Sequence, residues 1–474
     1  MPALIAGFAM AAVAQTAPAP PSPNIVFVLA DDLDRAITTV QPPVMPNLTR
    51  LIGAAGATFS RAYVNVPLCG PSRATILTGR YAHNTGMIQN WYPYFTRANG
   101  ERSTIAVWLA AAGYRTALFG KYLNRYPESV TPTYVPPGWT DWAVPVSGDP
   151  NASYVLNENG TLVSYVNGGS SDYFTDVLAR KALALIDQAA DASQPFFLML
   201  TPTAPHKPAV PATRHASLFA DSTTPRTSSF NERDVRDKAR FLQLPVISEA
   251  RIAQMDELYR NRLRSLQAVD EAILAIHDKV EQRGLLASTY FVFTSDNGYH
   301  MGQHRLTDSI NGGKETDFEE DIRLPMMISG PSIPAGLTVG RLASLADLAP
   351  TFAAWASAVP DITIDGRSLV PVLGTAPPAT WRNWLPIRHW KPSGITASNP
   401  AQSFIGVRTA RYTYARYPEF AIRDLYDMSV DAAQRDNVAY KAPAALLSRL
   451  DSMATSLAGC AGEVCRSLEN AAGP

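Results

Sequence analysis

Five short apolar runs, separated by longer segments with helical spacing, constrain the fold of this chain more than any other feature. The runs are residues 24–30, 116–119, 196–200, 290–294 and 325–329. They are rich in β-branched and aromatic residues and lack regular polar alternation, which is typical of strands buried on both faces of a sheet. Strands that alternate with helices predict an α/β fold with a large, mainly parallel sheet sandwiched by helices.

Four intervening segments are predicted to be helical. They are residues 46–56, a segment from an N-cap at Ser103 to Gly113, residues 172–190 and residues 256–284. The last of these is the longest, and its apolar side chains recur at helical spacing through Leu258, Leu263, Leu266, Val269, Ile273 and Ile276. The long segment 207–247 is rich in Pro, Ser, Thr and charge, so we expect an irregular loop that is functional or mobile.

The character of the chain changes near residue 376. Tyr and Arg recur through residues 407–414, which favours antiparallel strands, and a final helix is expected over 443–457. We therefore predict a main domain of residues 24–375 and a small C-terminal subdomain of residues 376–474, an antiparallel sheet plus a helix. A chain of 474 residues also fits three domains by length alone, but one large and one small unit is typical of large α/β enzymes.

The first residues have the composition of an export signal. Residues 4–14 are apolar and end in Ala12-Val13-Ala14, a small-residue cleavage site, so residues 1–14 are predicted to be a signal peptide and 15–23 a linker. A disordered apolar tail is the alternative, because no Lys or Arg precedes the apolar stretch. The 41 basic and 41 acidic residues balance, which argues against nucleic acid as a partner. We expect no membrane span, since no later segment is apolar for about 18 residues.

Polar side chains follow four of the predicted strands. Asp31 and Asp32 come directly after the first, Lys121 follows the second, His206 the third, and Asp296 and Asn297 the fourth. Ligands of open α/β sheets bind beyond the carboxyl ends of the strands, so we expect these six residues to meet at one site.

The oxygen-bearing members of this set predict a metal site. Carboxylates and the amide oxygen of Asn297 are hard ligands that suit Ca²⁺ or Mg²⁺ and do not suit zinc or copper. Each motif also has a plainer interpretation. Asp31-Asp32 alone is more often a capped or solvated turn, and Asp296-Asn297-Gly298 alone is more often a hairpin turn.

The chain has three cysteines. Cys460 and Cys465 lie close together in the sequence and can pair in an exported protein, which leaves Cys69 without a partner. Cys69 is then either a buried, inert thiol or a chemically altered residue.

The order of these motifs resembles that of the type I sulfatases, the formylglycine-dependent members of the alkaline-phosphatase-like superfamily. In chain order they are Asp31-Asp32, Leu68-Cys69-Gly70-Pro71-Ser72-Arg73, Gly120-Lys121, Pro205-His206, Asp296-Asn297-Gly298 and Lys314. Many of these enzymes carry Gly-Lys-Trp-His at the first lysine. Here Leu123 stands at the histidine position, within a Gly-Lys-Tyr-Leu-Asn run similar to that of the N-acetylglucosamine-6-sulfatase branch.

The resemblance implies a role for each residue. A maturation enzyme converts Cys69 to formylglycine, and residue 69 joins the metal ligands Asp31, Asp32, Asp296 and Asn297. The formylglycine hydrate attacks sulfur with one hydroxyl and expels sulfate with the other, and Asp296 is the expected proton acceptor. Lys121 and Lys314 stabilise the sulfate charge, His206 protonates the leaving alcohol, and His300 lines the pocket. If Pro71 opens a helix that ends near Gly79, Arg73 lies in its first turn beside the reacting group.

Taken one at a time, these residues have plainer explanations: most Arg and Lys residues form surface ion pairs or are solvated, and a lone His usually has no chemical role. The occurrence of all these motifs in one chain, in the order of the family, favours an exported, metal-dependent sulfatase. We expect Ca²⁺, with Mg²⁺ as the alternative, and a sulfated sugar or aryl substrate, with 6-O-sulfated N-acetylglucosamine as the expectation from the branch. An exported protein would be periplasmic or secreted, or lysosomal in a eukaryote. The rivals are a phosphate or phosphonate monoesterase on the same fold, and a catalytically silent glycan-binding protein in which Cys69 is never converted.

Overall fold

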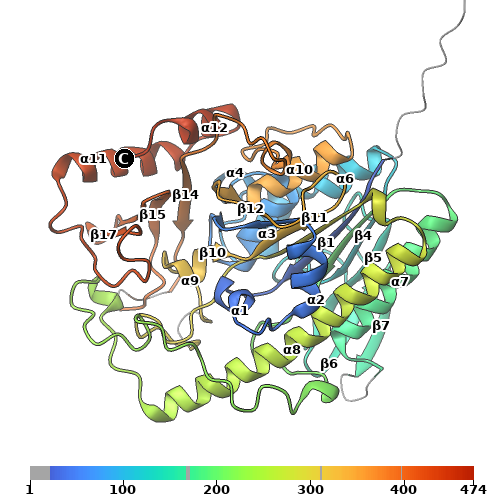
Figure 1. Ribbon diagram of the computed structural model, residues 1–474, viewed down its shortest axis with the longest axis horizontal. Coiled ribbons are helices and arrows are strands. Elements are labelled where there is room, and N and C mark those ends of the chain that lie inside the picture. The colour runs from blue at the N-terminus through green and yellow to red at the C-terminus, as the bar shows by residue number, and fades with distance from the viewer. Residues whose placement is uncertain (1–21, 167–170, 310–311, 395, 397) are drawn as a thin grey trace, which may run out of the picture.

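A ten-stranded sheet forms the centre of the protein in the computed structural model, which describes residues 22–166, 171–309, 312–394, 396 and 398–474 (Figure 1). The predicted signal peptide, 1–14, and most of the predicted linker lie outside the described residues. The middle of the sheet is parallel and has the order β9-β1-β8-β4-β5. These strands are β9 (Thr289–Ser295), β1 (Asn24–Ala30), β8 (Phe196–Thr201), β4 (Arg115–Gly120) and β5 (Asp141–Gly148).

Mostly antiparallel pairs extend this parallel centre on both sides. One edge adds β11 (Met326–Ser329), β2 (Ala57–Phe59) and β12 (Leu337–Val339), and the other adds β6 (Ser153–Glu158) and β7 (Thr161–Val166). The outermost pair on the first of these edges, β12 with β2, is parallel. The fifth apolar run is therefore a strand as predicted, but β11 runs antiparallel to β9. A small separate sheet is formed by β10 (Arg323–Leu324), β3 (Ala62–Tyr63) and β13 (Ala343–Ser344).

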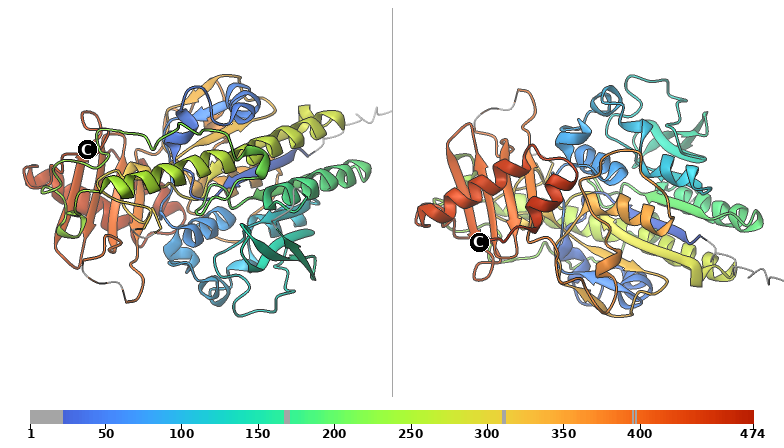
Figure 2. Two further views of the ribbon diagram at one scale, coloured as in Figure 1. Left: turned by 90° about the horizontal axis from the view of Figure 1, so that it is seen from below. Right: turned by 90° about the horizontal axis from the view of Figure 1, so that it is seen from above.

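Helices cover both faces of the large sheet, as the apolar runs predicted. Alternate residues of β1 enter two different cores: Phe27 packs with α6 (Ile105–Ala111) and α10 (Leu348–Trp355), and Val28 packs with α7 (Phe174–Asp191) and α8 (Glu249–Gln282). Figure 2 shows α7 and α8 side by side along the sheet in the view from below. Burial of every residue of β1 explains why that run shows no polar alternation.

The helix predictions hold in position and differ at the ends. Residues 46–56 contain α2 (Pro46–Leu48) followed by a π-helix at Thr49–Ala54. The helix for which Ser103 was predicted as the N-cap begins one residue later, with Thr104 as its N-cap. α8 begins at Glu249, before the predicted 256, because the Ser248 hydroxyl caps its first turn. The remaining helices are α1 (Arg35–Thr39), α3 (Cys69–Thr78), α4 (Ala82–Thr85), α5 (Tyr92–Arg97), α9 (Glu319–Ile322), α11 (Ala444–Leu457) and α12 (Glu463–Asn470).

A four-stranded antiparallel sheet follows the large one and confirms the predicted C-terminal architecture. It is formed by β14 (Trp384–His389), β15 (Phe404–Thr409), β16 (Tyr412–Tyr417) and β17 (Ile422–Asp427), with α11 packed across it (Figure 2). A disulfide joins Cys460 and Cys465. The boundary at residue 376 stays a prediction. In the described part of the chain, no helix is long and apolar enough to cross a membrane.

Gly120 ends β4 at the point where the chain turns into Lys121. Its φ of 116° lies in the region that only glycine adopts without strain, and a Cβ there would lie 2.1 Å from the carbonyl oxygen of Thr201 on β8. The next amide, of Lys121, donates to that same carbonyl at 2.8 Å. Close approach of the two strand ends thus requires glycine at this position.

We expect Gly120→Ala to lower the free energy of unfolding by roughly 3 kcal/mol or more, through backbone strain together with overpacking. Gly113→Ala is the matched control, because its φ is also positive, 88°, but no atom lies within 4 Å of the added Cβ. That variant should lose only about 1–2 kcal/mol. Urea unfolding measures both, and equal losses would show that contact with Thr201 is not the constraint.

Candidate functional site

Neighbouring strands deliver the predicted polar residues to one edge of the large sheet. Asp31 and Asp32 follow β1, Asp296 and Asn297 follow β9, and Lys121 follows β4. His206 lies five residues beyond the end of β8. Since β9, β1, β8 and β4 are adjacent and parallel, their carboxyl ends meet, and the structure brings all six residues together.

Three carboxylates and one thiol form the centre of this site. Side-chain ligand atoms of Asp31, Asp32, Asp296 and Cys69 all lie within 4.8 Å of one another, and all four residues are buried. The amide of Asn297 donates to Asp32 Oδ1 at 2.7 Å. Two oxygens, Asp32 Oδ2 and Asn297 Oδ1, are buried without a hydrogen-bond partner among the described residues. Unpaired hard oxygens beside a group of carboxylates fit a hard cation.

Cys69 is the first residue of α3, which points the thiol at the carboxylates. Its Sγ lies 3.6 Å from Asp31 Oδ1 and 3.7 Å from Asp32 Oδ1, and it accepts a hydrogen bond from Lys314 Nζ at 2.8 Å. Burial raises the pKa of the thiol well above its ordinary value, although Lys121 and Lys314 act in the opposite direction. The unconverted side chain is therefore a neutral thiol and a poor ligand for a hard cation.

The local geometry of α3 differs slightly from the prediction. The helix begins at Cys69, so Pro71 is its third residue and not its first, and it ends at Thr78 with Gly79 as the left-handed cap. Proline is compatible with the first turn because the amides there have no partner within the helix. Arg73 is the fifth residue of the helix and so lies in its second turn, not in the first as predicted, because the helix begins two residues before Pro71; its side chain still reaches Asp31 and Asp296.

Buried cations neutralise the carboxylates. Arg73 Nε pairs with Asp296 at 2.7 Å, and its Nη2 lies 3.8 Å from Asp31. Lys121 Nζ pairs with Asp31 at 2.7 Å, and Lys314 Nζ pairs with Asp32 at 2.5 Å. Three cations thus face three carboxylates in a region of low dielectric, where each interaction is strong.

The pKa values of the two adjacent aspartates follow from this pairing. Burial alone would raise the pKa of Asp31, but Lys121, His206 and Arg73 outweigh it and lower the value to about 2. Burial would likewise raise the pKa of Asp32, and Lys314 and His206 lower it to about 2. Both side chains are carboxylates at neutral pH.

A hollow of about 430 Å³ opens onto this cluster, within the size range of ligand pockets. Asp31, Lys121 and His206 line its inner end, and the His206 ring lies 3.5 Å from Asp32 with 37% of its side chain exposed. The rest of its wall includes Tyr122, Leu123, Asn124, Arg125, Tyr126, Asp149, Asn151 and Lys207. The hollow is therefore charged and polar at its inner end, while its wall mixes aromatic, aliphatic and polar side chains.

Lys314 reaches the site from a segment that follows no strand end. Residues near it pair through the backbone with the loop after Asn297: His300 N donates to Gly313 O at 2.7 Å, and Gly298 N donates to Asp321 O at 2.9 Å. His300 lies behind this pairing. It is fully buried, its Nδ1 faces Asp321 at 2.9 Å, and it does not line the hollow. A role in substrate binding for His300 stays a prediction.

Arg262 on α8 also belongs to this site, and the sequence patterns did not predict it. This side chain is fully buried and donates to two backbone carbonyls, Asp32 O at 2.7 Å and Pro205 O at 3.1 Å. It thereby links the loop that carries Asp32 to the loop that carries His206. The signal was present, because Arg262 stands next to Leu263 on the apolar side of the longest predicted helix.

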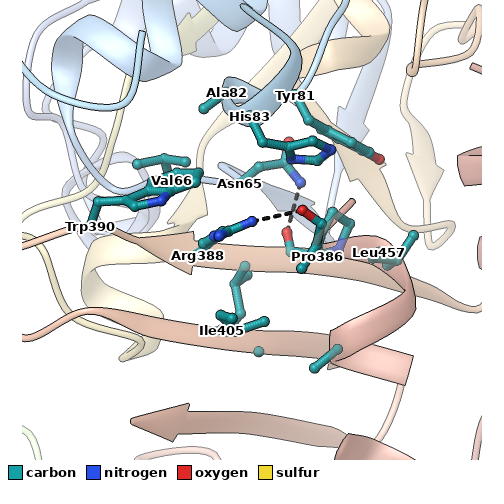
Figure 3. Close-up of a pocket in the computed structure, with 14 residues that line it drawn as sticks. Asn65, Val66, Tyr81, Ala82, His83, Pro386, Arg388, Trp390, Ile405 and Leu457 are labelled. Atoms are coloured by element: carbon teal, nitrogen blue, oxygen red, sulfur yellow. Dashed lines mark hydrogen bonds between the residues drawn. The ribbon is translucent and has the colours of Figure 1, made fainter. Parts of the chain in front are cut away.

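A second hollow lies between the C-terminal sheet with α11 and the segments that hold Asn65 and α4 (Figure 3). Val66, Tyr81, Ile405 and Leu457 line it, and Asn65 hydrogen-bonds across it to the backbone of β14. Its volume of about 20 Å³ is little more than one water molecule requires. This hollow is a packing gap at an interface and not a substrate site.

Two models of protein families match this chain, and both describe sulfate-releasing enzymes. The sulfatase family model matches residues 23–358, and a model described as N-sulphoglucosamine sulphohydrolase, C-terminal, matches residues 303–457. The chain belongs to the sulfatase family.

Two relatives illustrate the range of the match. A Sulf-1 homologue of Caenorhabditis elegans is 36% identical over 74% of this chain and 49% of its own length. The N-acetylglucosamine-6-sulfatase of Capra hircus is 30% identical over 94% of this chain and 85% of its own length. The chain spans about half the length of the first of these relatives, and 32% of the extracellular sulfatase SULF-1 homologue of Drosophila melanogaster.

Solved structures share the fold. A protein in complex with its substrate D-glucosamine-2-N,6-O-disulfate has a TM-score of 0.77 at 24% identity, covering 95% of this chain and 99% of that one. The phosphonate monoester hydrolase of Agrobacterium radiobacter has a TM-score of 0.70 at 20% identity, covering 92% and 95%. The fold of this chain is thus shared by a protein that binds a disulfated glucosamine and by a phosphonate monoester hydrolase.

Replacement of the buried Arg73 should lower the stability of the fold. We expect Arg73→Ala to lower the free energy of unfolding by about 3–5 kcal/mol, because Asp296 would remain as a buried, unpaired charge. Arg125→Ala is the control, since its pair with Glu128 is exposed and should contribute about 0.5 kcal/mol or less. Urea unfolding of both variants measures the difference. A loss for Arg73→Ala no larger than that of the control would contradict the assignment of Arg73 as the counter-charge of Asp296.

Proposed function

We propose that this protein is an exported, metal-dependent sulfatase that hydrolyses the sulfate ester of a sugar or an aryl alcohol. One observation carries the proposal. Cys69, in the run recognised by sulfatase maturation, lies within 4 Å of both adjacent aspartates, and one of these, Asp31, lines a ligand-sized hollow. The domain boundaries at 24–375 and 376–474 belong to this proposal, with the catalytic residues contributed by the larger unit.

The donor set fits a divalent cation. Asp31, Asp32, Asp296, Asn297 and residue 69 would hold it, and the two unpartnered oxygens of Asp32 and Asn297 support this set. We propose Ca²⁺, with Mg²⁺ as the alternative, because every donor other than the thiol is oxygen. When bound, the cation supplies positive charge that favours a deprotonated hydroxyl.

Conversion of Cys69 to formylglycine is part of the same proposal. The oxidised, hydrated side chain would supply two oxygens, one to take the sulfuryl group and one to release it, whereas an unaltered thiol supplies none. The partners implied are a maturation enzyme and a sulfated small molecule or glycan. Relatives named as extracellular sulfatases support export, to the periplasm, the outside of the cell or a lysosome-like compartment.

The remaining residues would stabilise the charge of the sulfate group or transfer protons. Lys121 and Lys314, now paired with Asp31 and Asp32, are placed to share the negative charge of a sulfate group. His206 lines the hollow beside Asp32, and its partly exposed ring protonates the leaving alcohol. Asp296 is the proposed proton acceptor at residue 69, and Arg73 fixes its carboxylate.

The substrate we propose is a sulfated amino sugar, in particular 6-O-sulfated N-acetylglucosamine. Support comes from the relative named N-acetylglucosamine-6-sulfatase, which aligns along 94% of this chain. A hollow walled by Tyr122, Tyr126, Asn124 and Asp149 offers both aromatic faces and hydrogen-bonding groups, which sugars require.

Protein from a host with the maturation machinery tests the proposal. We expect the peptide that contains position 69 to have the mass of formylglycine, and the enzyme to release sulfate from N-acetylglucosamine-6-sulfate and from an aryl sulfate. Cys69→Ala should lower kcat/KM by roughly 10³-fold or more. Faster turnover of the matching aryl phosphate would favour the phosphate or phosphonate monoesterase. An unmodified cysteine together with unchanged glycan binding in Cys69→Ala would favour the silent glycan-binding protein.

Chelation provides a separate test of the metal. We expect a chelator to abolish activity and lower Tm, and added Ca²⁺ to restore both, because a ligand that binds only the folded state stabilises it. In Asp32→Asn the Ca²⁺-dependent rise in Tm should be much smaller. An unchanged rise in that variant would place the cation elsewhere.

A further inference from the structure

We propose that Asp317 and Asp424 form a carboxyl pair that shares a proton and positions the segment carrying Lys314. Asp317 lies three residues after Lys314, and Asp424 lies on β17 of the C-terminal sheet. The pair would make the C-terminal sheet a determinant of the geometry of the active site. Its effect on stability does not depend on the proposed reaction, whereas its effect on catalysis rests on the proposed role of Lys314.

Both carboxyl groups are fully buried and half satisfied. Neither residue is exposed to solvent. One oxygen of each accepts a hydrogen bond: the Tyr417 hydroxyl donates to Asp317 Oδ1 at 2.9 Å, and the Asn437 amide donates to Asp424 Oδ1 at 2.8 Å. The second oxygen of each, Oδ2, is buried with no hydrogen-bond partner in the described part of the chain. Two buried carboxylate oxygens without donors are costly unless a proton or a cation lies between them.

Tyr417 places the two groups together. It lies on β16 opposite Ile422 of β17, so it shares a sheet face with Asp424, two residues further along β17. Its hydroxyl reaches from that face to Asp317. The residue opposite Asp424 is Ala415, whose small side chain leaves the space above it to the carboxyl group and the tyrosine ring.

The charges that face the pair do not neutralise it. Lys238, from the long loop, lowers the pKa of both acids, but its amine donates to Glu232 at 3.1 Å and to the carbonyl of Arg435 at 2.9 Å and also pairs with Asp237 at 3.5 Å. Asp237 faces Asp424, and Asp321 faces Asp317. The remaining neighbours, Tyr417 and Tyr426, are neutral phenols whose pKa values are raised by burial and by these acids.

Both acids therefore favour the protonated form. Burial, ahead of Asp321, raises the pKa of Asp317 to about 6, although Tyr417 and Lys238 oppose it. Burial, ahead of Asp317, raises the pKa of Asp424 well above its ordinary value. A protonated carboxyl donates where a carboxylate only accepts, so a shared proton satisfies both free oxygens.

The pair lies on a short path to the reacting centre. The segment that begins at Gly313 holds Lys314, whose amine contacts both Asp32 and Cys69. The C-terminal sheet region holds the same segment at a second place, where the amide of Glu319 donates to Gln434 Oε1 at 2.6 Å. Loss of the shared proton would place two like charges beneath this segment and loosen it.

The sign of the pH dependence follows from the raised pKa values. The unfolded carboxyls titrate near their ordinary value, so below about pH 4 both states are protonated and the pair contributes fully to stability. As pH rises, the unfolded state loses its protons first. Stability then falls with increasing pH until the folded pKa values have been passed, about 6 for Asp317 and higher for Asp424.

Asp424→Asn tests the pair, because the amide can donate like the protonated acid and has no charge to lose. Tm of the full chain is measured from about pH 4 to about pH 8. We expect the two proteins to match near pH 4 and the variant to melt about 2 °C or more above the wild type near pH 8. Asp278→Asn, at an exposed site on α8, should follow the wild type throughout.

Activity gives the positioning readout. In Asp424→Asn the alkaline decline of kcat should begin at higher pH than in the wild type, while kcat near pH 5 is unchanged. If the variant does not fold, the infrared band of a protonated carboxylic acid in the wild type near pH 7 should be present and should be lost in Asp317→Asn. Repeating the Tm series in Cys69→Ala separates this result from the proposed reaction, because that variant should show the same pH dependence.

Two outcomes would overturn the proposal. A Tm that falls equally with pH in Asp424→Asn and in the wild type would exclude a shared proton. A rise in Tm with added Ca²⁺ that is larger in the wild type than in Asp424→Asn would show that a cation, and not a proton, closes the gap between the two carboxyls.

Discussion

The buried balance of charge at the strand ends is the constraint on which the rest of the structure depends. Asp31, Asp32 and Asp296 would be very unfavourable in this environment without Arg73, Lys121 and Lys314. Each cation comes from a different element: a helix, a strand end and a long loop segment. The fold must therefore bring three distant parts of the chain to one point.

The parallel sheet supplies most of this convergence. The order β9-β1-β8-β4 places the chain after each strand on the same edge, where the carboxylates are buried. Arg262 then ties the loop after β1 to the loop after β8. Lys314 is the exception, because it depends on the pairing of its segment with the loop after Asn297 and on the C-terminal sheet.

Sequence reasoning succeeded where a local pattern carries the structural information. All five apolar runs are strands, and Asp31, Asp32, Lys121, Asp296 and Asn297 were found because they follow strand ends. The hairpin β6–β7 was not predicted. Its strand β7 contains Leu162, Val163, Tyr165 and Val166, but Ser164 interrupts the apolar run and none of these residues is buried. The first turn of α8 was missed because residues 249–254 present no buried face. Lys314 has no local signal and was found only through the resemblance, since packing between distant segments sets its position.

The pairing of the lysines bears on how such a centre accepts its ligands. Lys121 and Lys314 contact the same carboxylates that would hold the proposed divalent cation, so cation and lysines would compete for Asp31 and Asp32. A cation added to a balanced cluster leaves excess positive charge, which an anionic ester reduces by pairing with the released lysines. On this argument the site should bind the ester more tightly with the metal present, and the metal more tightly with the ester present, because thermodynamic coupling between two ligands is reciprocal.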